Sequence, residues 1–351
     1  MLFICLSLRN TNVKTFKLKK DPTAESRKKD HINLAFESQL KAAELDSRFN
    51  YEPAINAFNS TKNSLETTFL GKTFKTPIWV SSMTGGTEKA KIINKNLAKA
   101  CGEYGMGMGL GSCRALLESD ERLEDFAVRK FMNDQPLYAN LGVAQVEELI
   151  IENRLNLISE LVKKLDADGL IIHINPLQEW FQPEGDRYQM TPVEMIEKIL
   201  DFFPDLNIIV KEVGQGMGPK SLSALYKLPI KAVDFGSAGG TNFSILELLR
   251  ANESDIKLHH GLARVGHSAE EMVNFANNLY PDRELPIDTI ISGGVKNYLD
   301  GYYLTSKLNG NAIYGQASVF LRHALNDYEE LQQYVEKQIE GLIIANSFLT
   351  V

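Results

Sequence analysis

Residues 169–179 read GLIIHINPLQE, an apolar run that turns polar and then meets proline. This order predicts a β-strand whose carboxyl end leads into a loop, because proline cannot donate to the hydrogen-bonding ladder of a sheet. Side chains alternate along a strand, so His173 and Asn175 share one face if the strand continues to Asn175. An ordinary polar loop would have a similar sequence. The rest of the chain is needed to separate these two interpretations.

Seven other apolar runs of strand length accompany residues 170–174. They lie at 78–80, 106–110, 137–141, 208–210, 232–235, 290–291 and 312–314. Helix-like stretches lie at 88–104, 118–132, 146–165, 192–203, 219–227 and 297–308, with room for two helices in 236–289 and a last helix at 324–348. Strands that alternate with helices predict an α/β protein built from right-handed βαβ units. Eight of these units favour a closed (β/α)8 TIM barrel over an open sheet.

The composition excludes several classes of protein. The chain has 351 residues, of which 44% are hydrophobic and 24% charged, and its formal net charge of −7 disfavours nucleic acid as a partner. No apolar run reaches the roughly 20 residues of a membrane span. Three widely spaced cysteines indicate neither a disulfide framework nor a metal site, and they fit a reducing, cytoplasmic compartment. Residues 1–20 place basic residues after an apolar start, the wrong order for a signal peptide, and we expect a disordered extension there.

Small residues and glycines occupy the loops where this type of barrel carries its chemistry, after the carboxyl ends of the strands. They occur at 81–87, 109–112, 236–241, 292–295 and 315–318. Glycine allows a ligand to approach the backbone closely, so the loops after the last three strands predict a phosphate cup. Each glycine pair alone could be an ordinary turn, but their joint placement favours the ligand. Lys211 ends the fifth strand and places a cation in the same mouth.

A second set of charged residues predicts another anion subsite. Arg27 and His31 lie four residues apart in a stretch of helix-forming composition at 24–46, with Lys28 beside them. Arg114 adds a planar cation suited to phosphate oxygens. If the anion in this subsite is a diphosphate, it would repel a carboxylate that contacted it directly. Glu179 is therefore more naturally the ligand of a hard divalent ion. The competing interpretation is a solvated helix end and a surface glutamate.

Taken together, the motifs of this chain resemble those of the type 2 isopentenyl diphosphate isomerases, FMN-dependent barrel enzymes of isoprenoid synthesis. The resemblance covers about residues 24–345 and keeps the motif order. It rests on the segments 26–31, 83–86, 111–114, 173–186, 211–214 and 238–241. The Arg-Lys-x-x-His start combined with the His-x-Asn-Pro-Leu-Gln-Glu loop is specific to that family.

The resemblance implies a small diphosphate substrate whose double bond moves from isopentenyl to dimethylallyl diphosphate. Residues 21–76 would form an amino-terminal segment and lid, and residues 77–351 the FMN-binding catalytic barrel. The implied substrate-binding residues are Arg27, Lys28, His31, Ser112, Arg114, Asn175 and Gln178. Gln178 and His173 would be catalytic, and Glu179 would bind Mg2+.

The resemblance also implies reduced FMN as an acid/base cofactor, NADPH as its reductant and a homo-oligomer, either a tetramer or an octamer. The implied FMN-binding residues are Ser82, Met83, Thr84, Ser112, Asn140, Lys211, Thr241, Gly293, Gly294, Ala317 and Ser318. Three positions depart from the family pattern. Phe243 replaces a common tryptophan, Val295 and Lys296 stand where an arginine is usual, and Gly218 replaces a serine. These departures affect FMN packing more than the diphosphate or metal positions.

Two other functions stay open at the level of sequence. One is an FMN barrel oxidoreductase, such as a 2-hydroxy acid oxidase or an NAD(P)H-linked reductase. The nearest approach to a hydroxy acid clamp is His259-His260 with Arg264, in the long sixth loop. The other is a non-catalytic sensor of a phosphate ligand on a barrel scaffold. Net oxidation of substrate would indicate the first, and a colourless protein without flavin the second.

Overall fold

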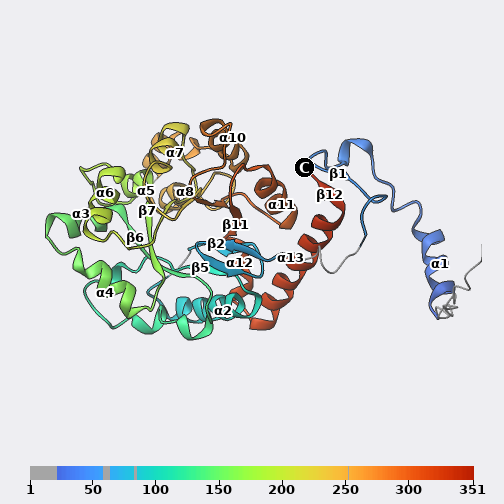
Figure 1. The fold of residues 1–351 in the computed structure, drawn as a ribbon, viewed down its shortest axis with the longest axis horizontal. Helices are drawn as coiled ribbons and strands as arrows, with labels where there is room; N and C mark the ends of the chain where they lie inside the picture. The colour runs from blue at the N-terminus through green and yellow to red at the C-terminus, as the bar shows by residue number, and fades with distance from the viewer. Residues whose placement is uncertain (1–21, 58–63, 83–84, 252) are drawn as a thin grey trace, which may run out of the picture. The chain divides into compact units, whose positions relative to one another are not determined.

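The computed structural model describes residues 22–57, 64–82, 85–251 and 253–351, in two compact units, Met1–Ser47 and Arg48–Val351 (Figure 1). In the described part of the first unit, helix α1 (Ala24–Leu34) is followed by the 3-10 helix η1 (Ala42–Glu44). The helical composition noted at 24–46 thus produces a shorter helix than the stretch could hold. The predicted disordered extension at 1–20 lies outside the described residues.

The second unit is built on a closed barrel of parallel strands, in the order β10-β11-β4-β5-β6-β7-β8-β9 (Figure 1). Each of the eight predicted apolar runs is a strand of this barrel. The strands are β4 (Ile78–Val80), β5 (Gly107–Gly109), β6 (Leu137–Gly142), β7 (Gly169–Ile174), β8 (Ile208–Glu212), β9 (Ala232–Asp234), β10 (Asp288–Ser292) and β11 (Ala312–Gln316). The prediction of a TIM barrel is confirmed.

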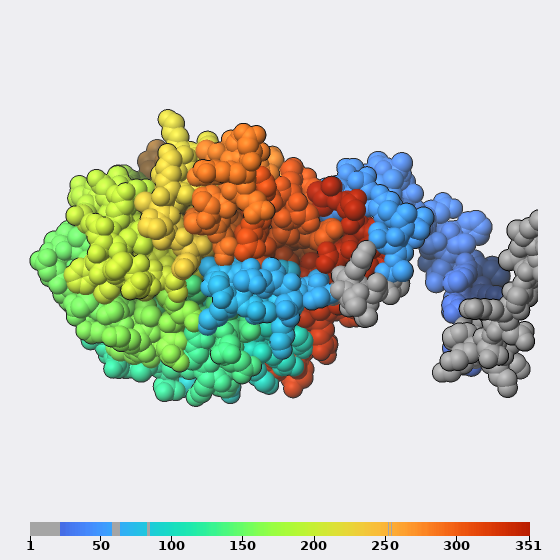
Figure 2. Space-filling model, viewed as in Figure 1, coloured from blue at the N-terminus to red at the C-terminus, as the bar shows by residue number. Residues whose placement is uncertain are grey.

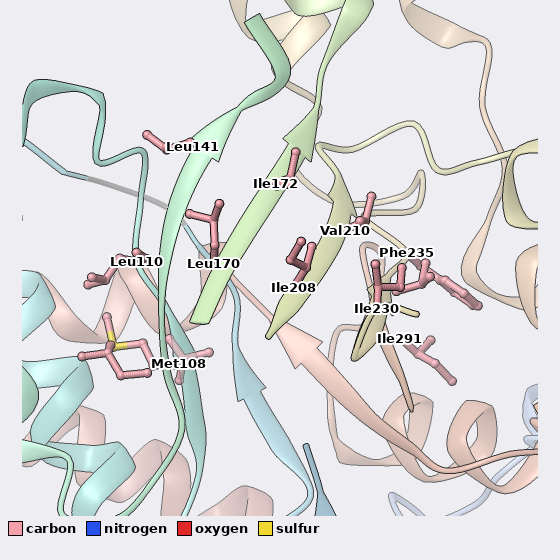
Figure 3. Packing of buried hydrophobic residues seen from close by; sticks show 14 of the residues in the cluster. Met108, Leu110, Leu141, Leu170, Ile172, Ile208, Val210, Ile230, Phe235 and Ile291 are labelled. Carbon is pink, nitrogen blue, oxygen red and sulfur yellow. The ribbon is translucent and has the colours of Figure 1, made fainter. Parts of the chain in front are cut away.

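Apolar side chains fill both faces of the strands, as expected for a parallel sheet covered by helices. On β7, Ile171 points into the barrel, where it packs with Trp79 and Tyr138. Its neighbours Leu170 and Ile172 belong to the outer layer between the strands and the helices. Figure 3 shows part of this outer layer, with side chains from β5 to β10. The alternation places His173 on the inward face, at the carboxyl end of the barrel.

A hairpin closes the opposite end of the barrel and was not predicted. Strands β2 (Thr67–Phe69) and β3 (Lys72–Phe74) pair antiparallel. Phe69 and Phe74 are fully buried and meet edge to face, with ring centroids 5.7 Å apart. The backbone N–H of Leu70 donates to Asp288 at the start of β10 (2.7 Å). In the space-filling view the hairpin fills the space between green and orange parts of the barrel unit (Figure 2).

Helices cover the barrel largely where the sequence predicted them. The α-helices of the second unit are α2 (Glu88–Tyr104), α3 (Val143–Ile151), α4 (Asn156–Lys164), α5 (Pro176–Phe181), α6 (Pro192–Phe202), α7 (Pro219–Leu225), α8 (Phe243–Arg250), α9 (Glu253–His259), α10 (Ala269–Leu279), α11 (Tyr298–Lys307), α12 (Ser318–Ala324) and α13 (Tyr328–Phe348). The long α13 confirms the predicted carboxyl-terminal helix. The short strands β1 (Asn50–Tyr51) and β12 (Leu349–Thr350) pair beside it.

Three helix predictions were wrong in detail. Residues 118–132 form short 3-10 turns, η3 (Leu123–Asp125) and η4 (Arg129–Phe131), because Phe126, Val128 and Met132 are all buried and their spacing cannot share one helical face. The stretch 146–165 divides into α3 and α4 at Asn153, whose φ is 56°. The described residues of 236–289 form three α-helices rather than two.

Candidate active site

A row of polar side chains crosses the carboxyl end of the barrel. His173 on β7 is paired in register with Lys211 on β8, which is paired with Asp234 on β9. All three residues follow apolar positions on their strands, so the polar row lies above the apolar interior. The Ser292 hydroxyl on β10 donates to the Asp234 carboxylate, which is fully buried. Burial raises the pKa of Asp234, an effect that the positive charge of Lys211 opposes.

The first cavity at this end, called here the glycine pocket, is suited to an anion. Its lining includes seven of the predicted FMN-binding residues: Ser82, Lys211, Thr241, Gly293, Gly294, Ala317 and Ser318. Lys211 and Lys296 supply positive charge, and no carboxylate occurs among the described residues that line it. Backbone amides and cations without an opposing acid favour a phosphate group.

Close backbone contacts explain why glycines occupy this pocket. Gly293 has φ 84°, and a Cβ there would lie 2.0 Å from the carbonyl oxygen of Ser237. A Cβ at Gly240 would lie 3.0 Å from the backbone nitrogen of Gly294. The loops after β9 and β10 therefore touch through their backbones, and side chains are excluded from the space between them. Small residues in close backbone contact thus line the place where the sequence predicted a phosphate cup.

A second cavity, called here the polar pocket, adjoins the glycine pocket. It brings together Ser112, Asn140, His173 and Gln178, which come from three different strand ends. Four residues line both cavities: Ser82, Lys211, Val213 and Phe243. A ligand in the glycine pocket can therefore contact a ligand in the polar pocket.

The His173 ring is held in one orientation within the polar pocket. The side-chain nitrogen of Asn140 donates to the carbonyl oxygen of Leu110 (2.9 Å), which leaves Asn140 Oδ1 as an acceptor for His173 Nδ1 (2.7 Å). Nδ1 then carries the proton, and Nε2 keeps its lone pair. Burial and the charge of Lys211 lower the pKa of His173 to about 3. The ring is neutral at neutral pH and can accept a hydrogen bond, but it is not a proton donor there.

The predicted metal ligand Glu179 lies in α5, the short helix that follows β7. Asn175 Nδ2 donates to Gln178 Oε1 (3.1 Å) and to Glu179 Oε1 (2.9 Å). The backbone N–H of Asp186 donates to Glu179 Oε2 (2.8 Å). Asn175 Oδ1 is buried and has no hydrogen-bond partner in the described part of the structure. Oxygen atoms of this kind suit Mg2+, which commonly takes one or two carboxylates and completes its shell with water and substrate phosphates.

The strand β7 ends one residue before Asn175, which corrects one expectation. Asn175 stands at the amino end of α5, and it borders a different cavity from His173. The two side chains therefore do not share a strand face, because the following Pro176 begins a helix instead of extending the strand. Among the described residues, no group of three or more His, Cys, Asp or Glu could hold a metal ion by itself. A divalent ion at Glu179 would therefore need ligands from other groups, including the substrate.

Arg187, a residue that the sequence motifs did not single out, stabilises α5 and the loop that follows it. Its Nη1 donates to the carbonyl oxygens of Glu179 (2.5 Å), Gly185 (3.1 Å) and Asp186 (3.2 Å). Its Nη2 donates to the carbonyl oxygen of Trp180 (3.0 Å). The guanidinium thus satisfies carbonyls at the carboxyl end of α5, where a positive charge is also favourable. A single arginine after a loop has no signal in sequence that distinguishes it from a surface residue.

The remaining predicted site residues fall into three groups: one near the loop after α5, three in helix α1, and two outside the described residues. Arg114 reaches the same loop through an ion pair with Asp186, at 3.4 Å. Arg27, Lys28 and His31 belong to α1 in the first unit, and none of the residues in this helix is buried. Met83 and Thr84 lie outside the described residues. In the described ranges of the chain, no helix has both the length and the apolar character needed to cross a lipid bilayer.

Comparisons with solved structures define the class of protein. The chain resembles a mandelate oxidase variant with an FMN adduct (TM-score 0.52, 13% identity, covering 86% of this chain and 87% of the other). It also resembles a flavocytochrome b2 variant with benzoylformate (TM-score 0.57, 15% identity, 85% and 71% covered). At these identities the likeness concerns the fold alone. The protein is a (β/α)8 barrel with a pocket lined by glycines and lysines at the carboxyl ends of its strands.

Sequence comparison identifies the family. Isopentenyl-diphosphate delta-isomerase of Rickettsia africae (strain ESF-5) is 34% identical over 323 residues, covering 91% of both chains. The enzyme of the same name from Rickettsia peacockii (strain Rustic) is 34% identical over 320 residues, covering 89% of this chain and 90% of the other. No protein-family model matches the chain. The chain belongs to the isopentenyl-diphosphate delta-isomerase family, as its motifs predicted.

Proposed function

We propose that this protein converts isopentenyl diphosphate into dimethylallyl diphosphate, with reduced FMN and Mg2+. The observation that supports this proposal best is the adjacency of the two pockets, which share Ser82, Lys211, Val213 and Phe243. A flavin whose phosphate lies in the glycine pocket can extend its ring toward the polar pocket. A substrate in the polar pocket would then lie against that ring. Two relatives named isopentenyl-diphosphate delta-isomerase, each 34% identical to this chain, support the same reaction.

The glycine pocket would hold the FMN phosphate on backbone amides of Gly293, Gly294 and the loop at Ala317 and Ser318. Lys211 and Thr241 would contact the rest of the cofactor, together with Ser82, Met83, Thr84, Ser112 and Asn140. When bound and reduced, FMN would supply an acid/base group from its ring with no net redox change.

The side chains of this protein would orient the alkene for two proton movements. One proton is added to the terminal carbon and another is removed two carbons away, so the double bond moves and the composition is unchanged. Lys211 would place positive charge beside the cofactor. His173, neutral and oriented by Asn140, would accept a hydrogen bond in the polar pocket. Gln178 would orient the reacting carbons, because its amide has no pKa that allows it to serve as the sole base.

The diphosphate would be bound by cations and a metal ion. Glu179 and the unpaired oxygen of Asn175 are the proposed Mg2+ ligands. Arg114 would approach from the loop after β5, and Arg27, Lys28 and His31 would bind from the lid of residues 21–76. The role of this lid, a tetramer or octamer, NADPH as reductant and a cytoplasmic location remain predictions. So does a disordered extension at residues 1–20.

The proposal is tested by an anaerobic assay with isopentenyl diphosphate, FMN, NADPH and Mg2+. We expect conversion by the wild type. We expect Glu179→Gln to lower kcat/KM at least a hundredfold at limiting Mg2+, because a neutral amide binds a hard cation weakly. Glu184→Gln is the matched control in the loop that follows α5, where Glu184 pairs with the exposed Arg250. No conversion by the wild type would refute the activity, and consumption of NADPH in proportion to substrate would indicate an oxidoreductase instead.

A further inference from the structure

A third cavity, called here the outer cavity, adjoins the glycine pocket and has a volume of about 330 Å³. The two cavities share four lining residues: Gly239, Gly293, Gly294 and Lys296. Three of these are glycines, so no side chain separates one cavity from the other at these positions. Arg48 and Asp300 line the outer cavity and not the glycine pocket. Their charges therefore lie close to the proposed phosphate site without bordering it.

The Asp300 carboxylate joins two segments that are distant in sequence. Its Oδ2 accepts the backbone N–H of Lys296 (2.9 Å), and its Oδ1 accepts a hydrogen bond from Arg48 Nη1 (2.8 Å). The Arg48 and Asp300 side chains are 33% and 18% exposed, so this ion pair is partly shielded from water. Asn297 caps α11 by accepting the N–H groups of Leu299 (2.9 Å) and Asp300 (3.2 Å). Hydrogen bonds thus fix the turn from Lys296 to Asp300.

Aromatic rings hold the Arg48 guanidinium beside Asp300. The guanidinium carbon lies 5.2 Å from the centroid of the Phe49 ring and 5.4 Å from that of the Tyr303 ring on α11. The Phe49 and Tyr303 rings meet edge to face, with centroids 5.9 Å apart. Strand β1 follows Phe49 directly and pairs with β12. Arg48, the first residue of the second unit, is thus anchored to that unit, and its charge stays beside the carboxylate.

The charges of Asp300 and Arg48 should have opposite effects on an anion in the glycine pocket. A carboxylate close to a phosphate opposes its binding, and the repulsion is screened less where water is partly excluded. The guanidinium of Arg48 cancels this charge. By orienting the carboxylate it also fixes the backbone of Lys296, which with Lys211 supplies positive charge to the glycine pocket.

We propose that Arg48 is a positioning residue for the cofactor phosphate: it neutralises and orients Asp300, and Asp300 holds Lys296 where its ammonium contacts the phosphate. This inference rests on the proposed function, which supplies FMN as the occupant of the glycine pocket. Arg48 acts through Asp300 and does not touch the cofactor. It was not among the residues that the sequence motifs singled out.

The test compares FMN with riboflavin, which has the same ring and ribityl chain but no phosphate. Binding to the full-length protein, freed of flavin, is measured by the quenching of flavin fluorescence. For Arg48→Gln we expect the dissociation constant of FMN to rise about fivefold, as the loss of a partly exposed ion pair predicts. Arg48→Lys keeps the charge and should give a smaller rise. The dissociation constant of riboflavin should change less than about twofold in both variants, because riboflavin presents no phosphate to Lys296.

A double-mutant cycle tests whether Arg48 acts through Asp300. Asp300→Asn removes the carboxylate that Arg48 neutralises, so Arg48→Gln should weaken FMN little further in that background. Arg154→Gln is the matched control, because it removes ion pairs with Glu118 and Glu152 (2.8 Å each) between α3 and α4. It should leave the affinity for both flavins unchanged. Urea unfolding of each variant shows whether a change in affinity reflects a loss of folded protein.

Four outcomes would overturn the inference. They are an unchanged affinity of Arg48→Gln for FMN, equal weakening of FMN and riboflavin in that variant, effects of Arg48→Gln and Asp300→Asn that multiply fully in the double variant, and a wild type that binds FMN no more tightly than riboflavin. Failure of the proposed reaction is distinguishable from these. A wild type that binds FMN and shows the expected cycle, but converts no isopentenyl diphosphate, would refute the reaction and support the role of Arg48.

Discussion

At the residue scale, the electrostatic state of His173 determines what it can do. The ring lies next to Lys211 in a mostly buried layer, and both features disfavour the protonated form. Asn140 fixes the proton on Nδ1, so only Nε2 can accept a hydrogen bond. A Cβ at Gly142 would lie 2.8 Å from that nitrogen, so the strand β6 also restricts the ring. His173 is therefore suited to orient a partner group and not to deliver a proton at neutral pH.

This state makes the stability of the protein depend on pH. The pKa of His173 is lowered from 6.5 to about 3 in the folded chain, so the unfolded chain binds a proton first as the pH falls. Folding stability is then lost between about pH 6.5 and pH 3. Lowering the pH from 7 to 5 should reduce the free energy of unfolding by about 2 kcal/mol through His173. Urea titrations at both pH values measure this difference.

The experiment compares a test variant, His173→Asn, with a control variant, His260→Asn. His173→Asn should be less stable than wild type at pH 7 but should lose less stability on acidification. His260→Asn, at an exposed position, should keep the wild-type dependence on pH. If His173→Asn lost as much stability as wild type between pH 7 and pH 5, that loss could not be assigned to His173.

At the element scale, the short helix α5 and the loop after it form one braced unit. Arg187 binds carbonyl oxygens of Glu179, Trp180, Gly185 and Asp186, and its guanidinium lies 4.7 Å from the Trp180 ring. A Cβ at Gly185 would lie 2.0 Å from the carbonyl oxygen of Glu179, so the loop closes tightly on the helix end. The brace thus holds the Glu179 carboxylate near Asn175.

Loss of this brace should weaken the proposed binding of Mg2+ at Glu179 more than the proposed binding of FMN. We expect Arg187→Gln to raise the Mg2+ concentration for half-maximal activity about tenfold, because several hydrogen bonds to one charged group are lost. Arg187→Lys should give a similar change, since the compact ammonium of lysine cannot reproduce the planar set of donors of a guanidinium. The binding of Mn2+, followed by electron paramagnetic resonance, gives a second measurement.

Arg154→Gln is the control for the brace, since Arg154 forms exposed ion pairs with Glu118 and Glu152 elsewhere on the barrel. Its Mg2+ dependence and its affinity for FMN should match those of wild type. An Arg187→Gln variant with normal Mn2+ affinity would show that the loop keeps its form without the guanidinium.

At the scale of the whole molecule, closure of the barrel brings residues from 81 to 319 into two adjoining pockets. The opposite end is closed by the β2–β3 hairpin, whose Phe69 and Phe74 complete the interior core. Ion pairs anchor the same end, where Lys72 and Arg129 both contact Asp168 (2.5 and 2.6 Å). These apolar and charged contacts stabilise the amino ends of the strands, whereas the polar groups of the two pockets lie at the carboxyl ends.

Removal of the hairpin core should destabilise the barrel without altering the chemistry directly. We expect Phe69→Ala to lower the free energy of unfolding by about 3 to 5 kcal/mol, the usual cost of truncating a buried phenylalanine. Phe202→Ala, which is exposed, should cost less than about 0.5 kcal/mol. Denaturant unfolding of both variants measures the two values. A Phe69→Ala chain as stable as wild type would show that the hairpin is dispensable for the barrel.

Local pattern was sufficient for the eight strands, because each is a short apolar run bounded by polar or glycine-rich loops. It was insufficient at residues 118–132, where burial of Phe126, Val128 and Met132 overrode helical composition. The hairpin at 67–74 was missed because two strands of three residues carry little periodic signal. Arg187 was missed as a site residue, since its significance depends on which backbone carbonyls the fold brings to it.

The linear order of residues determined the family, the barrel and the set of polar side chains at the strand ends, because these depend on alternation, spacing and short motifs. Only the folded chain decided which of those side chains lie together. It placed His173 beside Lys211 and Asp234 through strand register, separated His173 from Asn175 by ending β7 at Ile174, and held Glu179 with Arg187. The physical reason is that register, burial and loop contact are properties of distant segments packed against each other.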